Sequence, residues 1–124
     1  MRTRMDTVTI YEYSKCSTCR KALKYLDANK ISYNKIPIVD QPPTEKELET
    51  ALARLGGDLR LLFNTSGIQY REMKLSKKIK TMDIKEGIAL LSNNGKLVKR
   101  PFVLTKSKAL VGFKEEVWDE IFKC

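Results

Sequence analysis

The chain contains no histidine, only three cysteines and no long apolar run. A structural zinc site needs four ligands, and two clustered cysteines with Cys124, the last residue, fall short of that number. No apolar run approaches the roughly 18 residues of a membrane span. No hydrophobic segment follows the basic N-terminus, so a secretory signal is not expected. Three cysteines without an export signal predict a cytoplasmic protein, whose paired cysteines serve turnover or sensing.

The chain is short and basic. Its 124 residues suffice for one domain, residues 1–124, with a core that needs no disulfides. Lysine and arginine number 24 against 15 acids, a formal charge of +9, which favours acidic proteins, nucleic acid or small anions as partners. The densest basic cluster, Lys74–Lys80, has no interleaved aromatic residues and is typical of a solvated helix face. Direct nucleic-acid binding is therefore not expected.

The spacing of apolar residues predicts an α/β fold. Strands are expected over residues 7–13, 31–36, 102–104 and 109–111, and helices over 17–30, from Thr44 to Gly56, and from 114 onward. The segment from 58 to 94 is predicted to be helical and broken into short pieces. Thr44 and Asp83 each begin a capping-box pattern. This order implies a mixed four-stranded sheet with helices on its faces.

The sequence Cys-Ser-Thr-Cys-Arg over residues 16–20 lies between the first strand and the first helix. Strand, Cys-x-x-Cys and amphipathic helix in that order indicate a thioredoxin-like redox motif. Cys16 is expected at the helix N-terminus, where free N–H groups, the helix dipole, Lys15 and Arg20 favour the nucleophilic thiolate. Cys19 lies one turn further, on the apolar face, where burial keeps it protonated. We therefore expect Cys16 to attack the substrate and Cys19 to displace the product by forming a disulfide with Cys16.

Two other interpretations of the cysteine pair stay open. In the first, the two cysteines are half of the ligand set of a zinc site. In the second, they are inert cysteines at the start of a helix. Redox chemistry is favoured over both because the strand-to-helix context matches as well as the spacing.

Four segments of the chain together resemble the ArsC/Spx family. This family covers glutaredoxin-linked arsenate reductases and the Spx redox-sensing transcription regulators. The resemblance spans about residues 7–122, and it implies a thioredoxin-like fold with a helical insertion, about residues 44–94, between the second strand and the C-terminal hairpin. The segments that carry it are Cys-Ser-Thr-Cys-Arg-Lys-Ala from residue 16, Leu-Arg-Leu-Leu-Phe-Asn from 59, Lys-Arg-Pro-Phe-Val from 99 and Val-Gly-Phe from 111.

The resemblance also implies roles for single residues. Cys16 matches the family nucleophile, and Arg60 and Arg100 match arginines that hold the oxyanion and stabilise the thiol-bound intermediate. Guanidinium groups suit that role because they neutralise an anion and donate paired hydrogen bonds. Pro101 matches a proline held in the cis form beside the cysteine. The catalytic residues are then Cys16, Cys19, Arg60 and Arg100, and the substrate-binding residues Ser17, Thr18, Arg20 and Pro101.

Two departures from the arsenate reductases affect the expected function. Those enzymes have one cysteine in the active loop, and they carry a third arginine where this chain has Gly112-Phe113. The resemblance implies an ArsC-like thiol–disulfide oxidoreductase that acts on arsenate or another oxyanion or disulfide, with no bound metal or prosthetic group. Glutathione with glutaredoxin, or thioredoxin, is its expected reductant. The alternative is a Spx-like regulator that binds the RNA polymerase alpha subunit and uses Cys16 and Cys19 as a switch.

Overall fold

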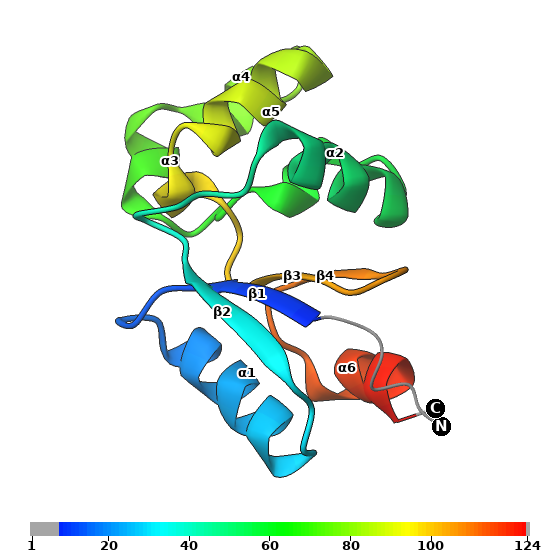
Figure 1. Cartoon of the computed structure of the whole chain (residues 1–124). Coiled ribbons are helices and arrows are strands. Elements are labelled where there is room, and N and C mark those ends of the chain that lie inside the picture. Colours follow the sequence, from blue (N-terminus) through cyan, green and yellow to red (C-terminus); the bar gives the residue numbers. More distant parts are fainter. Residues whose placement is uncertain (1–7, 124) are drawn as a thin grey trace.

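The computed structural model describes residues 8–123, so the N-terminal segment and Cys124 lie outside the described residues. Each end of the described chain contributes two strands and one helix, and a helical block lies between them (Figure 1). The strands are β1 (Val8–Glu12), β2 (Tyr33–Pro37), β3 (Phe102–Leu104) and β4 (Ala109–Val111). The helices are α1 (Ser17–Ala28), α2 (Glu45–Arg54), α3 (Ile68–Glu72), α4 (Leu75–Lys78), α5 (Ile84–Ser92) and α6 (Glu115–Phe122), with short 3₁₀ turns η1 (Leu59–Leu62) and η2 (Gly95–Leu97).

The four strands form one mixed sheet in the order β2-β1-β3-β4. Strand β1 pairs in parallel with β2 and antiparallel with β3, and β3 pairs antiparallel with β4. The parallel strands β1 and β2 are joined through α1, as a βαβ unit requires, and the antiparallel strands β3 and β4 form a hairpin. The predicted sheet and its helical insertion are confirmed.

Helices cover both faces of this sheet. Figure 1 shows α1 and α6 on one face and the block from α2 to α5 on the other. Side chains of β1 alternate between the two layers: Val8 and Ile10 belong to the core under α1 and α6, whereas Tyr11 belongs to the core under the helical block. The strand is therefore apolar on both sides, because both sides are buried.

The helical block is fastened to the sheet by polar contacts at two places. The Tyr11 hydroxyl of β1 donates to Glu47 of α2 at 2.6 Å, and Glu47 also closes the capping box with Thr44. At the far end of α2, the Arg54 guanidinium donates to the carbonyl oxygens of the β3–β4 turn, each at 3.0 Å. These contacts fix α2 over the sheet from both of its ends. The three acceptors in the turn are Thr105, Lys106 and Lys108.

One predicted capping box does not form, although its first residue is the N-cap. Asp83 precedes α5 as expected, yet its side chain makes no capping hydrogen bond in the described structure, whereas that of Thr44 does. Both Asp83 and Glu86 are exposed, so the start of the helix is open to water, which is an alternative acceptor for free N–H groups. Ile84, at the start of α5, is 49% exposed and does not join the buried face formed by Ile88 and Leu91. A capping pattern in the sequence thus predicts the start of the helix, not the hydrogen bond.

Candidate active site

Cys16 is the N-cap residue of α1. Its Sγ accepts a hydrogen bond from the backbone N–H of Cys19 at 3.3 Å, and its own N–H donates to the Tyr13 carbonyl at 2.9 Å. The sulfur thus takes the place that a serine or aspartate oxygen holds at an ordinary cap. The backbone N–H of Cys19 is one of the donors at the start of a helix that have no partner within the helix, and the Cys16 sulfur supplies its acceptor. Cys16 is partly exposed and lines the cavity described below.

Cys19 lies one turn into α1 and is fully buried. Burial, and then the hydrogen bond with Cys16, raise the pKa of Cys19 to about 12. Positive charge on Arg100 acts in the opposite direction but is the smaller influence on that pKa. Both cysteines are free thiols in this structure. The pair therefore has the asymmetry expected of an attacking and a resolving thiol.

Arg100 is held beside the cysteines by an aromatic ring. Its guanidinium carbon lies 5.0 Å from the centroid of the Tyr13 ring, at the distance of a cation–π contact. The Arg100–Pro101 peptide bond is cis, as predicted, and Pro101 is buried directly before β3. Arg100 thus has a fixed direction, with its charge available at the cavity beside Cys16.

A cavity of about 620 Å³ opens next to Cys16. Its walls come from the start of α1, the loop before α3, the strand hairpin and α6, segments that are far apart in the sequence. None of the residues that line it is acidic, and three carry positive charge: Lys99, Arg100 and Lys114. The remaining lining residues are Thr18, Asn64, Ser66, Gly67, Ile68, Leu110, Val111, Gly112, Phe113, Val117 and Trp118.

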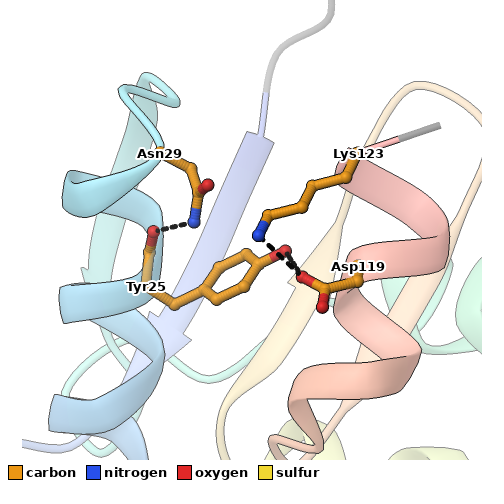
Figure 2. A network of polar contacts seen from close by, with 4 residues as sticks. All are labelled: Tyr25, Asn29, Asp119 and Lys123. Atoms are coloured by element: carbon orange, nitrogen blue, oxygen red, sulfur yellow. Dashed lines mark hydrogen bonds and ion pairs between the residues drawn. The ribbon is translucent and has the colours of Figure 1, made fainter.

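A polar network joins α1, which carries both thiols, to α6, which forms one wall of the cavity. The Tyr25 hydroxyl donates to Asp119 at 2.6 Å, and Lys123 pairs with the same carboxylate at 3.5 Å (Figure 2). Burial, and then this hydrogen bond, raise the pKa of Tyr25 well above its ordinary value, so the phenol stays protonated and donates. The Tyr25 ring also packs edge-on against Trp118. The network holds the cavity wall in register with the thiols.

Of the residues predicted for the site, the structure brings Cys16, Thr18 and Arg100 together around the cavity. Ser17 and Arg60 are exposed and do not line it. Arg20 is exposed and donates to the Ser14 carbonyl at 2.9 Å, which ties α1 to the loop that leads into it. The roles assigned to these residues stay predictions, and Cys124 lies outside the described residues.

Sequence reasoning missed the second and third cations of the cavity. Lys99 precedes Arg100 directly, and Lys114 is the N-cap residue of α6. Nothing in their local sequence separates them from solvated lysines, because only the fold brings them beside Cys16. Only the position of Lys99 directly before Arg100-Pro101 could have indicated from the sequence that Lys99 lies near the site.

The model of the ArsC family matches residues 11–121, which is nearly the whole described chain. The chain belongs to the ArsC family. Among curated relatives, the uncharacterized protein YusI of Bacillus subtilis is 43% identical over 114 residues, covering 92% of this chain and 97% of YusI. The regulatory protein MgsR of the same organism is 27% identical over 106 residues, covering 86% of this chain and 82% of MgsR.

Solved structures of ArsC relatives have the same fold. A putative ArsC family related protein from Bacteroides fragilis matches with a TM-score of 0.87 and 48% identity, covering 92% of this chain and 96% of that one. A possible arsenate reductase from Streptococcus mutans matches with a TM-score of 0.83 and 36% identity, covering 90% and 97%. The predicted family and the thioredoxin-like fold are therefore confirmed.

Two further properties bear on the predicted function classes. Among residues 8–123, no helix is long and apolar enough to cross a membrane. Within the same range, no three histidine, cysteine, aspartate or glutamate side chains gather closely enough to hold a metal ion.

Proposed function

We propose that this ArsC-family chain is a thiol–disulfide oxidoreductase that reduces a small oxyanion such as arsenate, or a disulfide. The observation that carries the proposal is the asymmetric thiol pair: Cys16 is half-exposed at a helix N-terminus beside a cationic cavity, and Cys19 is buried and protonated one turn away. The proposal places the protein in the cytoplasm, with no bound metal or prosthetic group.

The proposed reaction has two steps. With a disulfide substrate, Cys16 thiolate attacks one sulfur, forms a mixed disulfide and releases the other sulfur as a thiolate. Cys19 then loses its proton and attacks the Cys16 sulfur, which releases the second substrate thiolate and leaves a Cys16–Cys19 disulfide. The substrate gains two electrons and the cysteine pair loses two. Glutathione with glutaredoxin, or thioredoxin, then returns the two electrons to the pair.

Arsenate is reduced by the same thiols. Cys16 displaces one arsenate oxygen, which leaves as water, and Arg100 neutralises the bound anion through guanidinium hydrogen bonds. Arg60 is proposed to assist from η1. When Cys19 attacks the Cys16 sulfur, the electron pair of the sulfur–arsenic bond leaves with arsenic, which departs as arsenite. The two steps again end at the internal disulfide.

Turnover coupled to NADPH tests the proposed function. The protein is mixed with arsenate, or separately with hydroxyethyl disulfide, and with either the thioredoxin system or the glutathione–glutaredoxin system. We expect NADPH consumption above the blank without protein for at least one substrate, in one of the two systems. The productive system would identify the reductant. Consumption equal to the blank in all four mixtures would contradict an enzymatic role.

A second candidate function is redox-controlled regulation of transcription. Similarity to the regulatory protein MgsR, the second cysteine in the active loop and the charge of +9 favour it. In that case the Cys16–Cys19 pair would be a switch, and the chain would bind the RNA polymerase alpha subunit. Co-purification of this chain with the alpha subunit would favour the regulator, because an enzyme that acts on small substrates does not need to bind RNA polymerase.

A further inference from the structure

The cavity beside Cys16 carries an excess of positive charge. Lys99, Arg100 and Lys114 line it together, and no acidic residue does. Among residues 8–123, none of these three cations has a carboxylate within 4.0 Å, since the ion pair found there joins Lys123 and Asp119. A cleft lined by one sign of charge concentrates ligands of the opposite sign. The ligand of this cavity should therefore be an anion.

Lys99 lines this cavity, and both its backbone and its side-chain stem have close neighbours. Its N–H donates to the Leu62 carbonyl at 2.8 Å, which anchors the segment that leads into β3. Its Cε lies only 3.2 Å from the place where a Cβ on Gly112 would stand. Gly112 is buried, lines the same cavity and has a φ of 72°, a value that favours glycine. The missing side chain at position 112 thus leaves the space that the Lys99 stem occupies.

The cavity also has an apolar lining. Ile68, Leu110, Phe113, Val117 and Trp118 contribute to its lining, and Ile68 is 65% exposed. The volume of about 620 Å³ falls in the range of sites that hold small organic molecules, about 300–1,000 Å³. An inorganic oxyanion has no carbon surface to place on such a wall and would fill little of the space. An organic anion contacts both the charged and the apolar side chains of the lining.

We propose that Lys99 makes this site selective for organic disulfides that carry carboxylates, over neutral or cationic disulfides. The inference rests on the proposed function and narrows its substrate class. The Lys99 ammonium pairs with a carboxylate of the substrate, the carbon chain lies on the apolar wall, and a substrate sulfur faces Cys16. Cys16 then attacks that sulfur and releases the other half of the disulfide as a thiolate, by the two steps given above. Lysine suits this role because its flexible stem follows carboxylates at different positions.

Three small disulfides of similar length test the inference: dithiodipropionate with two carboxylates, neutral hydroxyethyl disulfide, and cystamine with two amines. Reduced protein is mixed with each, quenched with acid at successive times, and the oxidised fraction of Cys16 is measured by mass spectrometry. No external reductant is needed for this single turnover. The variants are Lys99→Gln, Lys99→Arg and, as matched control, Lys85→Gln, which removes an exposed lysine of α5 that does not line the cavity.

We expect the wild-type protein to react fastest with dithiodipropionate and slowest with cystamine. In Lys99→Gln, the ratio of the dithiodipropionate rate to the hydroxyethyl disulfide rate should fall about tenfold, the lower end of electrostatic effects on rates. Lys99→Arg and Lys85→Gln should keep the wild-type ratio. Added salt should also reduce it, because the charges are partly exposed.

The possible failures are distinguishable. If hydroxyethyl disulfide oxidises Cys16 but the Lys99→Gln ratio equals that of the wild type, the inference is wrong and the proposed function stands. The same conclusion follows if Lys85→Gln lowers the ratio as much as Lys99→Gln, because the effect would then come from net charge. If none of the three disulfides reacts with Cys16, the inference is refuted, and the proposed function then stands only if arsenate oxidises the Cys16–Cys19 pair in the same assay.

Discussion

Replacing Cys16 with serine should lower the rate of substrate reduction by a factor on the order of a thousand or more, as expected when a nucleophile is removed. The serine oxygen can still cap α1 and accept the N–H of Cys19, so the fold should survive. It cannot form the bond to sulfur or arsenic on which both steps depend. Coupled NADPH consumption measures the loss, and circular dichroism checks that the variant is folded.

The matched variant is Cys19→Ser, which keeps the nucleophile and removes the resolving thiol. It should still attack a disulfide but stop at the mixed disulfide on Cys16, which peptide mass mapping detects. Turnover that persists in Cys16→Ser, or a mixed disulfide that forms on Cys19 in the wild-type protein, would reverse the assignment of the two thiols. Cys124→Ser should behave as the wild type in both assays.

Replacing Gly95 with alanine should lower the free energy of unfolding by about 3 kcal/mol or more, at the upper end of typical overpacking costs. Gly95 is buried, and a Cβ there would stand 1.9 Å from the Ile38 carbonyl oxygen. That oxygen belongs to the backbone, so no side-chain rotation relieves the clash. The φ of Gly95 is not among the positive ones, so the cost comes from space alone. The contact joins the end of the helical block to the chain just after β2.

Gly87→Ala is the matched control, because Gly87 is also buried but meets a side chain instead. Its nearest neighbour would be Leu59 Cδ2 at 2.6 Å, the end of a flexible side chain that can move. Alanine also gains about 1 kcal/mol of helix propensity over glycine within α5. Urea unfolding should thus show a much smaller loss for Gly87→Ala than for Gly95→Ala. Equal losses would mean that the backbone at Ile38 yields as easily as a leucine side chain.

The fold could be predicted because its signals are local. The apolar residues of β1, the 3.6-residue spacing in α1 and the Thr44–Glu47 capping box are each recognised from neighbouring residues, and the structure bears them out. The burial of Cys19 also followed from helical spacing alone, since it lies on the apolar face of α1.

The cavity could not be predicted in the same way, because it depends on contacts between distant segments. Lys99 and Lys114 line the same cavity as Cys16 because β3 pairs with β1 and α6 packs on the sheet. The space that Gly112 leaves for Lys99 is likewise invisible in a linear pattern. Arg60 shows the opposite case: family resemblance gave it a role, while the structure places it exposed and away from the cavity lining. Its role requires a substrate complex to test.

The most direct test of the central claim is to map the disulfide formed in one turnover. Reduced protein is exposed to one equivalent of hydroxyethyl disulfide, remaining thiols are blocked with iodoacetamide in denaturant, and the peptides are sequenced by mass spectrometry. We predict a Cys16–Cys19 disulfide, with Cys124 alkylated, and complete recovery of both thiols on adding reduced thioredoxin or glutathione with glutaredoxin. A protein in which Cys16 and Cys19 both stay alkylated, or in which Cys16 pairs only with Cys124, would contradict the proposed mechanism.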